Sequence, residues 1–519
     1  MHVETAFVTL FSVATAVALV ARWIKVPYTV ALVVAGLVLG SAHAIEPPHL
    51  TKELLYALFL PGLLFEAAFH LDAQKFWQNK LAIHSLAVPG VAAAIGLTAV
   101  LLLPVANALH FVDGFELKHA LVFSALIAAT DPIAVVALFK SLGVPKRLAI
   151  LVEGESLLND GTAVVFFTLI LGAVNEGSHS FSVGTAMLDF VRVVGLGTLV
   201  GVTIGYLASK LTQRVDDPMI EITLTTIAAY GSFLFAEHFH LSGVIATVSA
   251  GMLCGNYGAR TGMSPSTRIA VESFWEYVAF ALNSIVFLLI GFEVHLDALS
   301  RSWKAILVAY LAVTVGRAAL LYVVTFFLRR TKETLPWSWS AVMTWGGLRG
   351  GLSMVLVLAL PQHFPHRELL VTMTFGVVIL SILFQGLSMA PLLRWLGLTG
   401  VSLDRIDYER ERGILRAKSA ALAALQRMQN EGAVHSAAAE QFRAEYAGAM
   451  ADAEQRLKDL HLQAEDLRQE EELATRRQLL LCEKDALRDA LRNGYLSQEI
   501  CDELLEDVDA RLMHIESAS

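Results

Sequence analysis

The sequence predicts an all-α membrane protein with about thirteen transmembrane helices, followed by a C-terminal helical domain in water. Only 17% of the 519 residues are charged, and the mean hydropathy is +0.58, whereas soluble proteins have about 25% charged residues. Residues 1–400 hold equal numbers of acidic and basic residues, so residues 401–519 carry the whole net charge of −9. The apolar runs are continuous and do not alternate with polar residues, which excludes a transmembrane β-barrel.

Thirteen apolar runs approach the roughly 20 residues that a helix needs to cross a bilayer. They lie at 4–22, 26–44, 53–70, 81–105, 118–140, 148–174, 185–209, 218–238, 241–256, 271–293, 302–328, 337–360 and 368–391. The ninth run is short and the gap before it is weak, so twelve helices remain an alternative. The first run is not typical of a signal peptide, because the preceding residues include no basic residue.

The connections between these runs predict the orientation of the chain. Lysine and arginine accumulate in short cytoplasmic loops. With the N-terminus outside, the six predicted inside loops hold 14 such residues and the outside segments hold 5. This bias favours an odd number of helices in the cell (plasma or inner) membrane, with the C-terminal region in the cytoplasm.

Two of the runs contain residues that interrupt a helix. Proline removes a backbone donor and disfavours helical angles at the residue before it, so the fifth run should break at Asp131-Pro132. The twelfth run contains "GGLRGG", in which four glycines around Arg349 allow the backbone to unwind. If the seventh run is a linker, these are the fifth helices of two inverted six-helix halves. Interruptions at matching places are typical of the midplane site of a transporter.

Ionisable side chains occur within five of the predicted membrane helices. They are Glu66 in the third run, Asp131 in the fifth, the stretch "EGESLLNDGTA" at 153–163 in the sixth, Arg317 in the eleventh and Arg349 in the twelfth. Such groups are rare in membranes and mark ion or substrate pathways by default. A buried ion pair that only fixes packing is the alternative for any single pair, but it does not account for five helices.

Helical spacing sorts the polar residues of the sixth run into two faces. Glu155 and Asn159 are four residues apart and share one face, while Ser156 and Asp160 share the next. We expect Ser156 and Asp160 to line a cavity with Asp131, and Glu155 to face an arginine. Oxygen ligands suit a hard cation, most naturally Na⁺, and no His/Cys set indicates zinc or copper. Burial favours a protonated carboxyl and a cation favours the ionised form, so competition between them indicates an exchanger.

The motifs resemble those of the monovalent cation:proton antiporters of the NhaP/NHE (sodium/proton exchanger) type. The resemblance rests on "ATDPIAV" at 129–135, "EGESLLNDGTAVV" at 153–165, "LPGLLFEAAF" and "WGGLRGGLSMVLVLALP", and it covers about residues 5–395. It implies thirteen helices, a homodimer in the lipid bilayer, and a mobile six-helix core that contains crossed, broken helices.

The resemblance also implies a role for each polar residue. Asp160 is the central carboxylate that alternates between proton and cation, together with Asp131. The implied cation-binding residues are Asp131, Asp160, Ser156, Thr130 through its main-chain carbonyl, and Glu66. The implied supporting residues are Asn159 as a brace between the crossing helices, Glu155 paired with Arg317, and Arg349 neutralising carbonyl ends at the broken twelfth helix.

These observations predict exchange of Na⁺ or Li⁺ for H⁺, for pH and sodium homeostasis, with no enzymatic activity and no cofactor beyond the transported ions. Exchange should be electroneutral at one to one, because Asn159 stands where a second carboxylate would carry a second proton. K⁺/H⁺ exchange remains an alternative, since K⁺ also uses oxygen ligands. A cation channel is an alternative of a different class, but it would show a pore-lining filter, and none is visible in the sequence. A transport-dead sensor would be expected to lose Asp131 or Asp160.

The remaining features predict organisation rather than chemistry. Residues 1–395 form the expected antiporter domain, and residues 396–519 form an expected cytosolic, regulatory unit of amphipathic helices. The acidic tail argues against nucleic acid or anionic lipid as a partner. The three cysteines have no metal-site or disulfide spacing. The segment "GLGTLVG" at 195–201 is expected to be a packing face within the seventh run.

Overall fold

The computed structural model divides the chain into two compact units, Met1–Thr399 and Gly400–Ser519. It describes all residues except 1–2, 25–26, 42–54, 110, 113, 177–182, 216, 293–295, 332, 400–402, 431–435, 464, 493–494, 498, 506, 509–510 and 512–519. Within this described part, the chain forms helices and no strand.

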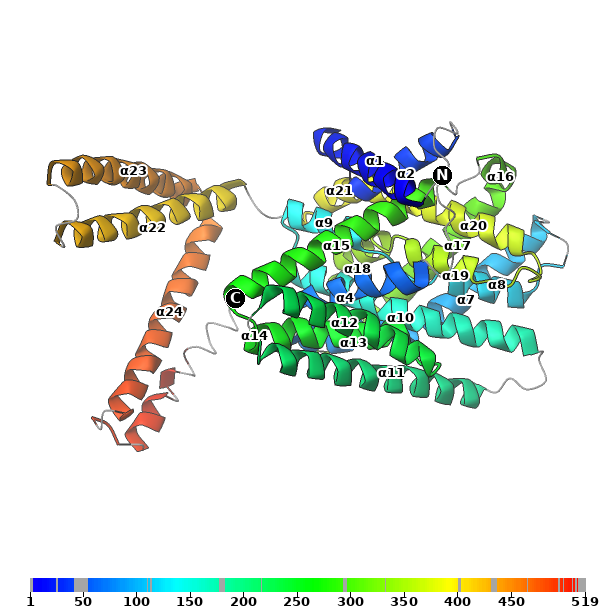
Figure 1. Cartoon of the computed structure of the whole chain (residues 1–519), viewed down its shortest axis with the longest axis horizontal. Coiled ribbons are helices and arrows are strands. Elements are labelled where there is room, and N and C mark those ends of the chain that lie inside the picture. The colour runs from blue at the N-terminus through cyan, green and yellow to red at the C-terminus, as the bar shows by residue number, and fades with distance from the viewer. Residues whose placement is uncertain are drawn as a thin grey trace. The chain divides into compact units, whose positions relative to one another are not determined.

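The first half of the membrane unit is a succession of apolar helices (Figure 1). They are α1 (Val3–Ile24), α2 (Tyr28–Ser41), the π-helical turn η1 (Leu55–Phe59) with α4 (Leu60–His70), α5 (Ala73–Gln78), α6 (Lys80–Ser85), η2 (Leu86–Gly90), α7 (Val91–Ala108), α8 (Leu117–Leu126), α9 (Ile133–Leu142) and α10 (Lys146–Glu176).

The second half continues from the long helix α11. It comprises α11 (Val183–Thr212), α12 (Pro218–His238), α13 (Gly243–Leu253), η3 (Cys254–Gly258), α14 (Ala259–Thr261), α15 (Pro265–Phe292), α16 (Leu296–Arg301), α17 (Trp303–Leu328), α18 (Trp337–Trp345), α19 (Gly351–Leu358), α20 (Arg367–Leu380), η4 (Ser381–Gln385) and α21 (Gly386–Trp395).

In the described residues, each of the thirteen apolar runs coincides with one helix or with two or three consecutive helical segments, which confirms the all-α membrane fold. Residues 42–44 of the second run and 53–54 of the third lie outside the described residues. Seven helical stretches in the described residues are long and apolar enough to cross a membrane: Lys80–Ala108, Lys146–Val174, Gly184–Thr212, Pro218–His238, Thr267–Phe292, Trp303–Leu328 and Arg367–Trp395. The doubtful gap at 238–241 separates two helices, because α12 ends at His238 and Ser242 caps the start of α13. The number of crossings and the inverted halves stay predictions.

Small residues let neighbouring helices pack with their backbones close together. A Cβ atom at Gly201 on α11 would lie 2.0 Å from the carbonyl oxygen of Ala246 on α13. At Gly36 on α2 it would lie 2.2 Å from the carbonyl oxygen of Leu288 on α15. Close approach of this kind is typical of helix pairs in membranes. The expected packing face at 195–201 is therefore confirmed, and α15 is held tightly against α2.

Both predicted helix interruptions are present in the membrane unit. The chain is not helical at 127–132 between α8 and α9, nor at 347–350 between α18 and α19. A backbone hydrogen bond connects the two breaks: the amide of Asp131 in the first donates to the carbonyl of Leu348 in the second at 2.8 Å. The broken helices thus cross at their interruptions.

The second unit consists mainly of three long helices, α22 (Leu403–Asn430), α23 (Ser436–Gln463) and α24 (Glu465–Arg492). Helices α22 and α23 pack against each other. Arg456 on α23 forms an ion pair with Glu411 on α22 at 3.1 Å, and the Lys418 ammonium lies 4.4 Å from the centre of the Tyr446 ring. These polar contacts fit helices whose outer faces meet water.

Candidate cation site

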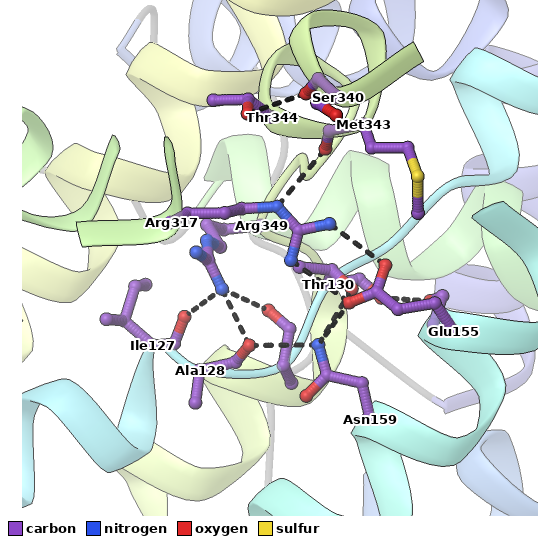
Figure 2. A network of polar contacts seen from close by, with 12 residues as sticks. Ile127, Ala128, Thr130, Glu155, Asn159, Arg317, Ser340, Met343, Thr344 and Arg349 are labelled. Atoms are coloured by element: carbon purple, nitrogen blue, oxygen red, sulfur yellow. Dashed lines mark hydrogen bonds and ion pairs between the residues drawn. The ribbon is translucent and has the colours of Figure 1, made fainter. Parts of the chain in front are cut away.

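The crossing point brings the C-terminal end of one half-helix against a buried guanidinium. Nη1 of Arg349 lies within hydrogen-bond distance of the carbonyl oxygens of Ile127, Ala128 and Ala129, at 2.5, 2.7 and 3.1 Å (Figure 2). These carbonyls follow α8 and have no helical partner, so they carry the partial negative charge of a helix end. Arg349 supplies the compensating positive charge and the missing donors.

This arrangement corrects one expectation from the sequence. Arg349 was expected to neutralise carbonyl ends at its own broken helix, the twelfth, but the carbonyls that it reaches belong to the break in the fifth. The crossing explains the difference, because it places the α18–α19 break directly over the end of α8. Arg349 is also anchored through its backbone amide, which donates to Ser381 Oγ at 3.0 Å.

The second arginine, Arg317, forms a buried, bidentate ion pair with a carboxylate of α10. Arg317 on α17 donates to both carboxylate oxygens of Glu155 on α10, from Nη1 at 3.1 Å and from Nη2 at 2.9 Å. Its Nε also donates to the carbonyl of Met343 at the end of α18. Both partners of the pair are buried. The expected pairing is present, and it ties α10 to one of the crossing helices.

Asn159 connects this pair with the broken fifth helix. Its Nδ2 donates to the Ala128 carbonyl at 3.2 Å, to Thr130 Oγ1 at 3.0 Å and to Glu155 Oε1 at 3.4 Å. Figure 2 shows Asn159 and Arg349 reaching the same short stretch of chain. An aspartate here would have no N–H groups for these acceptors. The asparagine therefore braces the unwound segment as a donor, in the position that the sequence predicted.

The neighbouring face of α10 lines a cavity of about 370 Å³. Glu153, Ser156 and Asp160 face into it, together with Thr130 and Asp131 of the broken helix. Spacings of three, four and seven residues place such groups on one side of a helix. The predicted division of α10 into a cavity face and an arginine-facing side is therefore correct.

Among the residues that line this cavity, Asp160 has a carboxylate oxygen that lacks a hydrogen-bond donor. Its Oδ1 atom is buried and has no hydrogen-bond partner among the described residues. A buried carboxylate oxygen without a donor is costly unless a proton or a cation reaches it. Next to it, Ser156 Oγ donates to the Thr130 carbonyl at 2.5 Å, which leaves that carbonyl a second lone pair for a cation.

Asp131 sits at the start of the half-helix α9. Its Oδ1 accepts a hydrogen bond from the Ile133 amide at 3.0 Å, so the carboxylate lies at the positive end of that helix. The α19 break passes very close to it, because a Cβ atom on Gly350 would lie 2.4 Å from Asp131 Oδ2. Glycine is required at 350 by this close approach.

Glu66 lines the same cavity nearer to its mouth. It is held by His70 on the next turn of α4, with 3.3 Å between His70 Nδ1 and Glu66 Oε1. Glu276 of α15 is also a lining residue, and its 68% exposed side chain marks the opening. Lys140 lines the cavity as well.

Four polar lining residues were missed by the sequence reasoning: His70, Lys140, Glu276 and Asn283. Lys140 and Glu276 stand near the ends of apolar runs, where charged residues are ordinary. Asn283 is a single amide within the tenth run, and only its spacing of seven residues from Glu276 hints at a shared face. Conversely, the sequence-predicted residues fall into two groups, with Asp131, Asp160, Ser156, Thr130 and Glu66 at the cavity and Asn159, Glu155, Arg317 and Arg349 behind it.

Comparison with known proteins assigns the membrane unit to a family. Residues 8–395 match the family described as "Sodium/hydrogen exchanger, transmembrane". The chain belongs to this family. It is accordingly a multi-pass membrane protein of a secondary transporter family, and the matched range contains every residue of the site.

Two curated relatives of this exchanger-family chain are similar over most of their length. It is 40% identical over 385 residues to the Na(+)/H(+) antiporter ApNhaP of Aphanothece halophytica, covering 74% of this chain and 72% of the relative. It is 33% identical over 503 residues to the Na(+)/H(+) antiporter NhaG of Bacillus atrophaeus, covering 94% and 93%. The second similarity extends well into the C-terminal unit.

A solved structure shares the fold of this family member. The sodium proton antiporter MjNhaP1 from Methanocaldococcus jannaschii superposes with a TM-score of 0.63 at 18% identity. The likeness covers 76% of this chain and all of that chain.

Proposed function

We propose that this protein exchanges Na⁺ for H⁺ across a membrane, with Asp160 as the exchange carboxylate. The observation that carries the proposal is the buried, unpartnered Oδ1 of Asp160 in a cavity whose mouth reaches an exposed residue. One oxygen that lacks a donor has two ways to be satisfied, by a proton or by a cation. Exchange follows if both compete for it and the cavity opens to each side in turn.

The ligand set proposed for Na⁺ contains only oxygen atoms. It comprises the carboxylates of Asp160 and Asp131, Ser156 Oγ and the Thr130 carbonyl, all of which line the cavity. Hard cations without d-electron preferences bind such sets. Glu66 is proposed as an additional ligand that the ion meets on its way in, because in this structure it contacts His70 instead.

The stoichiometry that we propose is one Na⁺ for one H⁺. The amide of Asn159 supplies donors to three acceptors, and it binds no proton of its own to exchange. Asp160 then remains the only carboxyl of α10 that exchanges, provided that Asp131, Glu153 and Glu155 keep their protonation states through the cycle. Such a cycle moves no net charge and is driven by the two ion gradients alone.

The orientation and assembly are proposed from the same reasoning. The mouth of the cavity carries Lys140, and this end of the fifth run precedes a loop rich in basic residues, so we place it in the cytoplasm of a cell (plasma or inner) membrane. The N-terminus is then outside. We propose a homodimer that serves pH and sodium homeostasis, with residues 1–395 as the transport domain and 396–519 as a cytosolic regulatory tail.

The test is transport by the purified full-length protein in proteoliposomes. A pH gradient is imposed, a proton-sensitive dye reports the inside, and Na⁺, Li⁺ or K⁺ is added in turn. We expect Na⁺ to dissipate the gradient, while K⁺ has little effect. The relatives described above are named for Na⁺, and no observation favours K⁺. A response to K⁺ alone would contradict the proposal.

A further inference from the structure

One polar side chain of α15 faces the cavity without a partner. Asn283 lines the same cavity as Asp131 and Asp160, its side chain is half-buried, and its amide makes no hydrogen bond with any described residue. Glu276, seven residues earlier on the same face, lies at the mouth. At 1.5 Å per residue, Asn283 is about 10 Å deeper along the helix.

Packing places this face of α15 directly beside the broken helix. Val286, one turn after Asn283, has its Cγ1 atom 2.9 Å from where a Cβ atom of Gly351 would stand. The neighbouring Gly350 abuts the Asp131 carboxylate, at 2.4 Å by the same measure. A short chain of contacts thus leads from the Asn283 face of α15 to the Asp131 carboxylate.

Asn283 also comes from a different helix than Asp131 and Asp160. Helix α15 packs on α2, α4, α12 and α1 and also contacts the crossing helix α19, whereas Asp131 lies in the break between α8 and α9 and Asp160 belongs to α10. Asn283 therefore reaches the cavity from a helix that bears neither of these carboxylates.

An amide without hydrogen bonds is less favourable at this position than an apolar side chain of the same size. Its neighbours on the helix are Leu282, Val286 and Phe287, and a leucine would fill a similar volume. An amide taken from water without hydrogen bonds loses free energy, so polar groups inside membranes usually face a water-filled or ion-conducting path. The simple interpretation is that water satisfies the amide. The cavity, however, also holds the two carboxylates at which we propose that a cation binds, and an amide oxygen is a hard-cation ligand.

We infer that the amide oxygen of Asn283 is a further ligand for the transported cation, supplied by α15 to the cavity that Asp131 and Asp160 also line. This inference rests on the proposed exchange of Na⁺. As a neutral oxygen, Asn283 replaces part of the hydration shell of the ion without adding a charge that would bind a proton. It strengthens cation binding and leaves the proton count unchanged.

The test is equilibrium Na⁺ binding by the purified full-length protein, measured as thermal stabilisation at increasing NaCl with choline chloride keeping the ionic strength constant. A ligand that binds the folded state raises its stability with concentration. The variants are Asn283→Leu and Asn283→Ala, which remove the oxygen, and Asn283→Asp, which keeps it. Ser284→Ala is the matched control, because Ser284 is the adjacent residue and bonds Tyr28 and the Phe280 carbonyl instead.

We expect Asn283→Leu to raise the Kd for Na⁺ about tenfold, the loss typical of one contact to a charged group. Asn283→Asp should retain Na⁺ binding, and Ser284→Ala should bind like the wild type. A wild-type Kd in Asn283→Leu would overturn the inference, as would equal weakening in the leucine and aspartate variants. So would failure of both Asn283→Leu and Asn283→Ala to give monodisperse protein, since the amide would then serve folding.

Failure of the proposed function has a separate signature. If wild type and Asp160→Asn are stabilised equally by NaCl, Asp160 is not the cation site, whatever the Asn283 variants do. If Na⁺ stabilises the wild type alone, the exchange site stands, and the Asn283 series then decides the further inference.

Discussion

The backbone amide of Asp131 donates a hydrogen bond to the carbonyl of Leu348 at 2.8 Å. This backbone bond joins the interruptions of two helices that are more than 200 residues apart in the chain, in addition to the side-chain contacts of Arg349. The carboxylate of Asp131 is consequently positioned by the α18–α19 break as well as by its own. A change in one interruption should be felt in the other.

Replacing Gly350 by alanine tests this coupling. The new Cβ atom would lie 2.4 Å from Cβ and Oδ2 of Asp131, so the carboxylate has to move. Misplacing a ligand by about 1 Å is sufficient to reduce the rate at least about tenfold, and we expect such a loss of Na⁺-driven exchange in folded protein. Gly172→Ala is the control, because a Cβ atom there meets nothing within 4 Å. Wild-type Na⁺ affinity and rate in Gly350→Ala would argue against the crossing geometry.

The buried pair of Glu155 and Arg317 should behave as one structural unit. Their side chains are 4% and 10% exposed, and removing one partner strands a charge, at a typical cost of about 3–5 kcal/mol in the free energy of unfolding. Either single alanine variant should unfold at a lower temperature, and the double variant should recover part of the loss. Thermal unfolding of all four proteins completes the double-mutant cycle. Strictly additive losses would show that the two residues do not interact.

The sequence was informative where a residue acts locally. Proline at 132 and the glycines around Arg349 interrupt helices by their own backbone chemistry, so both breaks were predictable. Helical spacing alone separated Ser156 and Asp160 from Glu155 and Asn159, and the cavity and the arginine pair follow that division. Periodicity and local sterics are properties of short segments.

Partners across the crossing could not be predicted in the same way. The carbonyls that Arg349 reaches lie about 220 residues away in sequence, and only the three-dimensional crossing selects them over the carbonyls nearby. Asn283 was missed because one amide in an apolar run has no pattern of its own. Its role can be inferred only once the three-dimensional structure shows that α15 lines the cavity.

Deleting the second unit should spare the exchange reaction. All proposed ligands lie in Met1–Thr399, which forms a compact unit of its own. A protein that ends at Thr399 should keep its maximal exchange rate within about threefold, because compact units usually fold independently. We expect changes in pH set point, stability or dimer lifetime instead. Loss of all transport in a well-folded, truncated protein would make the tail part of the transport machinery.

Exchange should not respond to membrane potential. If one Na⁺ replaces one H⁺ on Asp160, no net charge crosses the membrane. Proteoliposomes with a potential set by K⁺ and valinomycin, equal pH and equal Na⁺ on both sides should show no net Na⁺ uptake. Uptake driven by the potential alone would require more than one proton per Na⁺, and would point to Asp131 as a second proton carrier.

The most direct measurement compares wild type and Asp160→Asn for proton flux driven by an Na⁺ gradient in proteoliposomes. Asparagine keeps the size of the side chain and replaces the ionisable carboxyl group by an amide that cannot alternate between H⁺ and Na⁺, so the variant should remain folded and monodisperse. The account predicts rapid Na⁺-dependent proton movement in the wild type and none above protein-free liposomes in the variant. Normal flux in Asp160→Asn would contradict the assignment of Asp160 as the exchange carboxylate.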